Sequence, residues 1–307
     1  MTPRLTGYLI SITGVSIWST TPIFVGYLIT HYHMPALLLA FWRNLFVCLV
    51  LVPALLIFRP SLLKAGFDQL KLFFSYGLFL ALFNSIWTIS VKANGAGVAT
   101  VLAYSSASFT AVMAWRFFQE KLGFLKISSV ILSITGCIMV TNAFRPDMWK
   151  LNPIGIATGI LSGIMFACYN MVGKEASKRN INPWKSLFYS FAFGSVFILV
   201  FNMFSFLPGA AGNIENILPE LTADGWLVLL GLSVPSILGY GMYIASMDYL
   251  PVSIASLLAT TEPVMTAILA YILLHERMTF SQIIGSGLIL SAVTIVQFEK
   301  DETAGII

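Results

Sequence analysis

The sequence predicts an all-α membrane protein whose chain crosses the bilayer ten times, and three observations lead to this prediction. Of the 307 residues, 58% are hydrophobic and only 10% are charged, whereas soluble domains carry about 25% charged residues. The mean hydropathy of +0.87 means more apolar surface than a soluble chain of this size could bury. The apolar residues also fall into stretches close to the roughly 20 residues that a membrane-spanning helix needs.

The predicted spans are separated by prolines, charged residues and short polar segments. The first begins at Leu5 and no small-residue cleavage site follows it, so we predict a membrane helix there and not a removable signal peptide. Pro153 and Pro183 stand in the first turns of two later spans, where the missing N–H has no helical partner to lose. The ten predicted spans are residues 5–29, 35–57, 71–92, 95–118, 124–142, 153–173, 183–206, 225–247, 252–274 and 280–297.

Lysine and arginine are unevenly distributed between the two sides of the membrane. With a cytoplasmic N-terminus, 12 of the 17 lie on the cytoplasmic side, 4 lie on the opposite side, and Arg43 lies within a span. Cytoplasmic loops of membrane proteins are enriched in these residues. The sequence therefore predicts a multi-pass protein of a plasma membrane, the bacterial inner membrane, with both termini in the cytoplasm.

Residues 95–121 are similar to residues 251–277, which lie 156 positions further along the chain. Seven aligned positions are identical, and the charged turn at Glu120 falls on the turn at Glu276. If each half of the chain holds five crossings, an odd number, the second half must enter the membrane from the opposite side. The sequence thus predicts two repeats of inverted topology.

We place the first repeat at residues 1–146 and the second at residues 147–307. Inverted repeats let two halves of a protein move around a site near the bilayer midplane and expose it to either side. The repeats therefore favour a transporter over a membrane assembly protein that transports nothing, which is the alternative from another class.

Several local patterns resemble the EamA-type members of the drug/metabolite transporter superfamily. They are Gly14 to Trp18-Ser19, Pro35 to Arg43, and the stretch from Ala245 to Arg277 with its Glu262-Pro263 pair. The resemblance covers nearly the whole chain. It implies a basket of ten helices around a cavity lined by helices one, three, four, six, eight and nine. It also implies transport of small metabolites such as amino acids, vitamins, nucleoside-related compounds or cationic drugs, often outward.

Glu262 lies about halfway along the ninth predicted span. A carboxylate at this depth is costly unless it faces the protein interior or carries a proton. Glu262 is therefore a candidate for coupling transport to protons or for binding a substrate ammonium group. Alternatively, it has a structural role and satisfies backbone groups freed by Pro263 or joins a network between helices. The first repeat has Ser106 at the matching position, so this acid is present once.

Arg43 is a second charged residue within a span, about nine residues from the outer end of the second helix. It could attract an anionic substrate group. The alternative is a structural charge that pairs with polar groups or extends toward the interface. We favour the structural role, because the resemblance implies a peripheral second helix.

Polar and aromatic residues lie near the middle of the six helices that the resemblance places around the cavity. Such groups are expensive against lipid and should point inward, although a single Ser or Thr is more often an interhelical bond than a ligand. As a set, aromatic faces and hydroxyls suit a zwitterion, a flat ring or an organic cation. The predicted substrate-binding residues are Trp18, Thr21, Asn84, Trp87, Tyr104, Ser106, Tyr169, Asn170, Tyr240, Tyr243 and Thr261.

The sequence predicts no enzyme, no metal site and no cofactor. His31, His33 and His275 all lie at span ends, so no base for intramembrane catalysis is available, and the three cysteines lack metal-ligand spacing. No basic run suits nucleic acid, and no glycine-rich loop suits the phosphates of a nucleotide. The expected partners are the lipid bilayer and a small-molecule substrate, with protons as a candidate coupling ion and with monomer and homodimer both open.

These features predict a secondary active transporter that exports amino acids or similar small metabolites by alternating access around a central cavity. Proton coupling through Glu262 is one version of this hypothesis. A carrier for vitamins, nucleoside-type compounds or cationic drugs is the alternative within the same class of protein.

Overall fold

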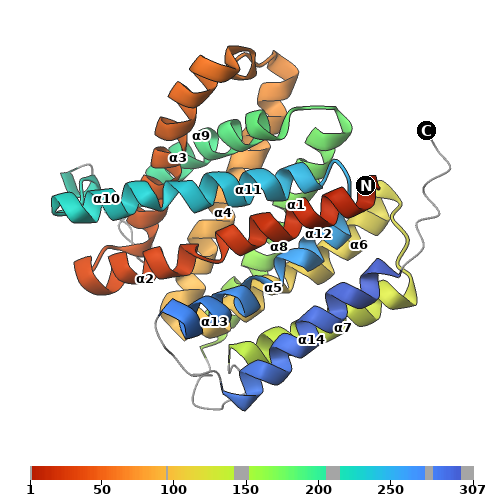
Figure 1. Cartoon of the computed structure of the whole chain (residues 1–307). Helices are drawn as coiled ribbons and strands as arrows, with labels where there is room; N and C mark the ends of the chain where they lie inside the picture. The colour runs from red at the N-terminus through yellow and green to blue at the C-terminus, as the bar shows by residue number, and fades with distance from the viewer. Residues whose placement is uncertain (1, 95, 142–151, 205–214, 274–278, 299–307) are drawn as a thin grey trace.

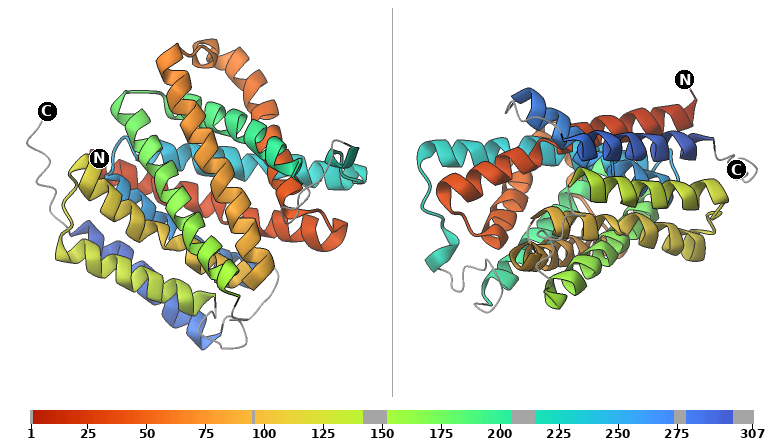
Figure 2. Two further views of the ribbon diagram at one scale, coloured as in Figure 1. Left: turned by 180° about the vertical axis from the view of Figure 1, so that it is seen from behind. Right: turned by 90° about the horizontal axis from the view of Figure 1, so that it is seen from below.

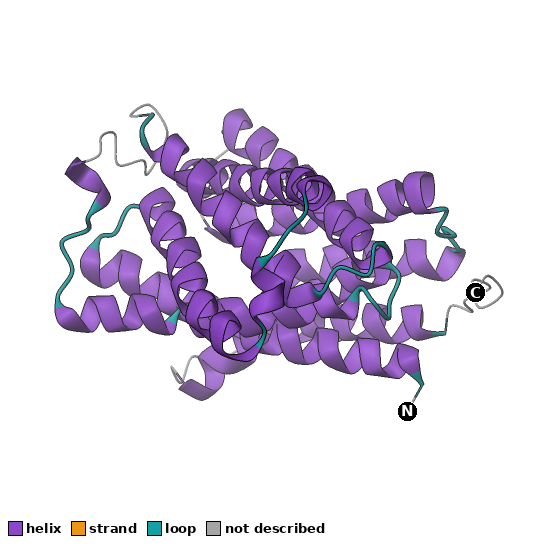
Figure 3. Cartoon of the chain, turned by 90° about the horizontal axis from the view of Figure 1, so that it is seen from above, coloured by secondary structure: helices purple, strands orange, loops and turns teal. Residues whose placement is uncertain are grey.

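The computed structural model describes residues 2–94, 96–141, 152–204, 215–273 and 279–298. These residues form helices and no strands, and the helices pack into one bundle (Figures 1 and 3). In this described part of the chain, nine helical segments are long and apolar enough to cross a membrane, and the apolar helix Phe124–Val140 is somewhat shorter. The predicted all-α membrane fold is confirmed.

The helices agree with the predicted spans to within a few residues at most ends. In chain order they are α1 (Pro3–Trp18), α2 (Thr21–Tyr32), α3 (Ala36–Phe58), η1 (Pro60–Leu63), α4 (Phe67–Asn94), α5 (Ala96–Tyr104), α6 (Ser106–Phe118), α7 (Phe124–Val140), α8 (Pro153–Lys178), α9 (Pro183–Asn202), η3 (Glu215–Ile217), α10 (Ala223–Gly231), α11 (Ser233–Ser246), α12 (Val252–Ala259), α13 (Glu262–Leu273) and α14 (Phe280–Gln297).

Four predicted spans are each interrupted near the middle, so that α1 and α2, α5 and α6, α10 and α11, and α12 and α13 are pairs of shorter helices. Pro22, Pro235 and Pro263 lie in the first turn of the second helix in three of these pairs. Proline cannot donate a hydrogen bond to the preceding turn, and its ring crowds the carbonyl four residues earlier. The pair α5 and α6 has no proline; there the Ser105 hydroxyl donates to the Leu102 carbonyl at 2.5 Å.

The interruptions in the fourth and ninth spans occupy matching places in the two repeats. α6 begins at Ser106 and α13 begins at Glu262, which are the positions that the 156-residue shift aligns. Thr110 and Thr266, which the same shift aligns, both bond to the opposite repeat: Thr110 accepts from Asn170 of α8, and Thr266 donates to the Ser19 carbonyl just after α1. The two segments therefore share the position of their break, and each has a threonine that bonds to the opposite repeat.

The bundle is held together by pairs of helices that lie side by side. α4 packs along α8, α1 packs along α11, and α7 and α14 form a pair on one flank (Figure 2). Glycines allow the closest approaches. At Gly136 of α7 and Gly285 of α14, a built Cβ atom would lie 2.7 Å from the carbonyl oxygen of the other glycine, so the backbones themselves touch.

The beginning of α1 and the end of α14 lie at the same end of the bundle (Figure 1). An even number of crossings requires this arrangement. Which side of the membrane this end faces stays a prediction. The predicted boundary between the repeats, at residues 146 and 147, falls outside the described residues.

Candidate functional site

Glu262 meets Tyr104 where the two matching helix interruptions face each other. Tyr104 is the last residue of α5, and its hydroxyl donates to Glu262 Oε2 at 2.6 Å. Tyr104 is buried, whereas the side chain of Glu262 is partly exposed. The bond joins the two repeats at mid-span, so Glu262 takes part in an interhelical contact.

Side chains other than Glu262 form hydrogen bonds with the polar groups around the break in the ninth span. The Cys137 thiol of α7 lies 3.9 Å from the Thr260 carbonyl, and the Ser133 hydroxyl donates to the Thr260 hydroxyl at 2.6 Å. Thr266 donates to the carbonyl of Ser19, at the break in the first span, at 3.2 Å. These contacts satisfy polar groups at the breaks without using Glu262.

Arg43 reaches from α3 to α4, where its Nη2 donates to Asn84 Oδ1 at 2.9 Å. The Asn84 amide in turn donates to the Leu80 carbonyl at 2.9 Å, which holds the asparagine in place. This is the pairing expected of a structural charge.

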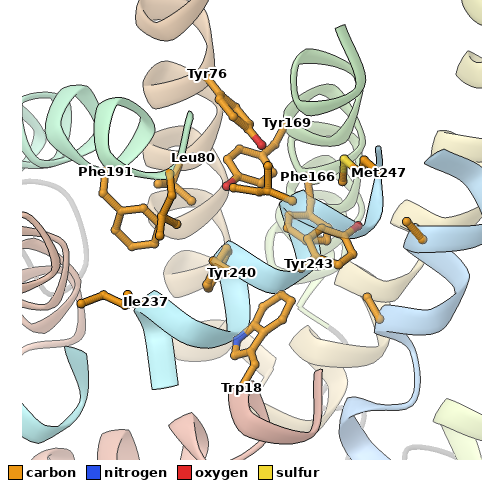
Figure 4. Packing of buried hydrophobic residues seen from close by; sticks show 14 of the residues in the cluster. Trp18, Tyr76, Leu80, Phe166, Tyr169, Phe191, Ile237, Tyr240, Tyr243 and Met247 are labelled. Atoms are coloured by element: carbon orange, nitrogen blue, oxygen red, sulfur yellow. The ribbon is translucent and has the colours of Figure 1, made fainter. Parts of the chain in front are cut away.

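Aromatic rings from α1, α4, α8 and α11 fill the space beside this region (Figure 4). The rings of Trp18 and Tyr240 have centroids 4.4 Å apart, and those of Tyr76 and Tyr169 are 4.3 Å apart. Phe166 lies between them, 6.2 Å from Trp18 and 5.8 Å from Tyr169. Four of the predicted substrate-binding residues therefore belong to one packed aromatic cluster: Trp18, Tyr169, Tyr240 and Tyr243.

Asn170 joins four helices through its amide group. Its Oδ1 accepts from the Tyr243 hydroxyl at 3.0 Å, and its Nδ2 lies 3.2 Å from Thr110 Oγ1 and 3.3 Å from Ser256 Oγ. Asn170 is completely buried. Protein partners thus occupy both ends of this amide, and the predicted substrate contact of Asn170 stays a prediction.

The remaining predicted residues lie near the breaks or along α4. Thr261 is buried and donates to the Leu258 carbonyl of its own chain segment at 2.8 Å. Thr21 is buried with a hydroxyl that has no hydrogen-bond partner, and Ser106 is buried at the start of α6. Trp87 is partly exposed, one turn beyond Asn84. Their roles in binding stay predictions.

Sequence reasoning missed Tyr76, Phe166, Thr110 and Ser256. Tyr76 and Phe166 complete the aromatic cluster, and the other two bond to Asn170. Single aromatic or hydroxyl residues in an apolar span carry no local signal that separates an inward from a lipid-facing position. Thr110 could have been found, because the repeat aligns it with Thr266. In the described part of the chain, no group of three His, Cys, Asp or Glu residues could hold a metal ion.

Polar contacts hold the helix ends together where α1 begins, one set between the repeats and one within the second repeat. The carboxylate of Glu120 accepts from the backbone N–H of Val252 at 2.8 Å and from the hydroxyl of Ser253, at the N-terminus of α12. Lys174 Nζ donates to the carbonyls of Met247 and Leu250 at 2.5 and 3.0 Å. A negative charge is favourable at a helix N-terminus, so Glu120 ties the first repeat to the second here.

Glu120→Ala is expected to lower the free energy of unfolding by about 1–3 kcal/mol, because buried N–H and hydroxyl donors at the start of α12 lose their acceptor. The matched control is Glu175→Ala, which removes a partly exposed pair with Arg179 worth about 0.3–0.5 kcal/mol. Unfolding of both variants in detergent, followed by intrinsic fluorescence, measures the difference. Equal shifts would contradict a bond between the repeats.

The fold and the site define the class of this protein. A bundle of apolar helices with paired mid-span breaks, and with a carboxylate at one break, is the architecture of a membrane transporter. The EamA-like transporter family matches the chain twice, over residues 5–142 and 153–298. The chain belongs to this family, and the resemblance seen in the sequence is confirmed.

Relatives of this chain include several proteins named as transporters. A probable amino-acid metabolite efflux pump of Salmonella typhimurium is 27% identical over 304 residues, covering 96% of this chain and 95% of its own. An uncharacterized transporter of Archaeoglobus fulgidus is 33% identical over 143 residues, so the chain spans only 47% of that relative. Similarly, it spans 65% of an uncharacterized transporter of Synechocystis, at 25% identity.

One solved crystal structure shares this fold over nearly its full length. It aligns with a TM-score of 0.76 at 16% sequence identity, and the alignment covers 95% of this chain and 97% of that one. At this identity the likeness concerns the fold alone. It agrees with the all-helical architecture described above.

Proposed function

We propose that this transporter exports amino acids or similar small metabolites by alternating access, with Glu262 as the group that couples transport to protons. The observation that carries the proposal is the bond between Tyr104 and Glu262, which joins the matching breaks of the two repeats at mid-span. A movement of one repeat against the other must change this contact. Glu262 as a residue is only partly buried, and a carboxylate that a movement of the repeats exposes could exchange a proton or meet a substrate.

The amino-acid part of the proposal is supported by the name of a relative that aligns over 96% of this chain, a probable amino-acid metabolite efflux pump. An uncharacterized inner membrane transporter of Salmonella typhimurium, 23% identical, supports an inner-membrane location. The excess of lysine and arginine on one side supports cytoplasmic termini. Vitamins, nucleoside-type compounds and cationic drugs are the alternative substrates.

Counterflow in proteoliposomes tests the substrate. Purified protein is loaded with one unlabelled compound at high concentration, and the uptake of the same labelled compound is followed. We expect counterflow with amino acids and none with vitamins, nucleosides or organic cations. Counterflow with one of the latter groups, and none with amino acids, would replace the proposed substrate class.

Tyr104→Phe is expected to weaken transport about tenfold or more, because a hydrogen bond to a charged group contributes about 1.5–3 kcal/mol. The ring is kept, so the packing of Tyr104 in the buried interior is preserved. Initial rates of amino-acid counterflow measure the effect. Tyr27→Phe, an exposed tyrosine on α2, is the matched control and should transport like the wild type. If Tyr104→Phe transports at the wild-type rate, the Tyr104 hydroxyl has no role in transport.

A further inference from the structure

A pocket of about 570 Å³ lies at the end of α6, on the end of the bundle where α1 begins (Figure 1). Residues 115–116 near the end of α6 and residues 119–123 of the following turn line it. This volume is in the range of sites for small ligands. Trp115 and Arg116 are exposed on the surface of the bundle, and neither Tyr104 nor Glu262 lines the pocket. The pocket is therefore separate from the candidate transport site.

Hydrogen bonds on both sides of the turn between α6 and α7 fix the shape of this pocket. Gln119 ends α6 in the left-handed conformation, with a φ of 57°, and the N–H of Glu120 donates to the Ala114 carbonyl at 3.2 Å. Such a bond closes the last turn of a helix and sets the direction of the chain that follows. On the α7 side, Lys126 donates to the Lys121 carbonyl at 2.8 Å. The turn is held at both ends, so the pocket is a fixed part of the fold.

The residues that line the pocket carry a net positive charge. Arg116 and Lys121 are basic, and Glu120 is the one acid among them. The carboxylate of Glu120 already accepts from the N-terminus of α12 and pairs with Lys126 at 3.7 Å. The Arg116 guanidinium lies 5.9 Å from the centre of the Phe117 ring, and it has no ion-pair partner within the part of the chain that the structure describes. Arg116 therefore offers its charge to an anion from outside the protein.

Exposed aromatic residues around the pocket indicate that it lies where the membrane meets water. Trp115 and Phe117 are exposed at the end of the apolar helix α6. Tryptophan is enriched at this level of a membrane, beside the lipid headgroups. Phe124 follows the pocket directly and begins an exposed apolar face of α7 that continues with Ile127 and Ile131. An occupant thus meets a positive charge in the pocket and an apolar helix face beside it, which matches the two parts of a phospholipid.

We propose that this pocket binds the headgroup of an anionic phospholipid, with Arg116 on its phosphate and with Trp115 and the apolar face of α7 against its acyl chains. Arginine suits this role because its planar guanidinium can hold a phosphate through two parallel bonds. A soluble phosphate compound would use the charge of the pocket but not the apolar face beside it. The proposal is independent of the transported substrate, since none of the candidate transport residues lines the pocket.

The fluorescence of Trp115 reports whether a lipid occupies the pocket. Purified full-length protein is reconstituted in phosphatidylcholine vesicles with increasing fractions of a dibrominated lipid, whose bromine atoms quench nearby tryptophans. Dibrominated phosphatidylglycerol is compared with dibrominated phosphatidylcholine, and subtraction of the signal of Trp115→Phe isolates Trp115. We expect half-maximal quenching of Trp115 at a roughly fivefold lower fraction of phosphatidylglycerol, the factor that one basic residue contributes at an anionic membrane surface.

Arg116→Gln tests the charge in the pocket and should remove the preference for phosphatidylglycerol. Arg116 is exposed, so the variant is expected to fold. Arg116→Lys keeps the charge without the planar guanidinium and should retain part of the preference. Arg59→Gln, the same change at an exposed arginine that follows α3, is the matched control and should keep the preference of the wild type.

Four results would overturn the proposal. Equal quenching of wild-type Trp115 by the two lipids would show that the pocket does not select an anionic headgroup. An unchanged preference in Arg116→Gln would remove Arg116 from the site. An equal loss in Arg59→Gln would show that the general surface charge attracts the lipid, and not this pocket. If millimolar glycerol phosphate relieves the quenching by phosphatidylglycerol, the pocket binds soluble phosphate compounds instead of a lipid.

Discussion

Glu262→Gln is expected to abolish proton-dependent flux while the protein stays folded and inserted in the membrane. The amide has the shape of the carboxylic acid, and its carbonyl oxygen can still accept the hydrogen bond that Tyr104 now gives to Glu262 at 2.6 Å. It cannot gain or lose a proton at any pH used for transport. Any step that requires a change of charge at this position should therefore stop.

The measurement is amino-acid flux in proteoliposomes with and without a pH gradient across the membrane. We expect the gradient to drive accumulation with the wild type and to have no effect with Glu262→Gln. Glu175→Gln, which changes a partly exposed acid on α8, is the matched control and should behave as the wild type. If flux through Glu262→Gln keeps its dependence on the gradient, Glu262 is not the coupling group.

Gly285→Val is expected to destabilise the protein strongly, while Gly287→Val, two residues further along α14, should have little effect. A Cβ atom at Gly285 would lie 2.7 Å from the carbonyl oxygen of Gly136, and the Cβ of Met139 is equally close. Backbone cannot move aside as the end of a flexible side chain can. Overpacking of this kind typically costs about 1–3 kcal/mol, and contact with backbone places this case at the upper end.

Gly287 provides the matched control because a Cβ atom built there meets nothing within 4 Å. Both variants replace glycine by valine in the same helix, so the change in helix propensity is the same. The difference in stability between them therefore measures the contact between α7 and α14. Thermal unfolding in detergent should show a lower midpoint for Gly285→Val and a shift of less than about 0.5 kcal/mol for Gly287→Val. Similar midpoints for the two variants would show that the close contact between α7 and α14 at Gly285 does not contribute to stability.

The sequence predicted the membrane spans closely because hydrophobic length is a local property. The span predicted at residues 280–297 is α14 (Phe280–Gln297), and the span at residues 35–57 is α3 (Ala36–Phe58). Each of these stretches must satisfy its backbone within the helix, since lipid offers no partner. Composition and proline position were therefore enough to place them, without knowledge of their neighbours.

The interruptions within four spans were only partly visible. Pro22, Pro235 and Pro263 lie at three of them, and proline removes a helical hydrogen bond. The break after Tyr104 has no such signal. Only the structure shows this break. It lies at Ser106, the position that the repeat aligns with Glu262, where the ninth span is also interrupted.

By itself the sequence determined the fold class, the two similar segments and the residue types available for transport, because each follows from hydropathy or from identity along the chain. Tertiary structure decided which of these residues meet. Tyr104 and Glu262 are 158 positions apart, and Arg43 and Asn84 are 41 apart. Such pairs depend on how helices rotate and cross, which is set by close backbone contacts like that of Gly136 and Gly285. The buried amide of Asn170 shows the same dependence, because its protein partners come from three other helices.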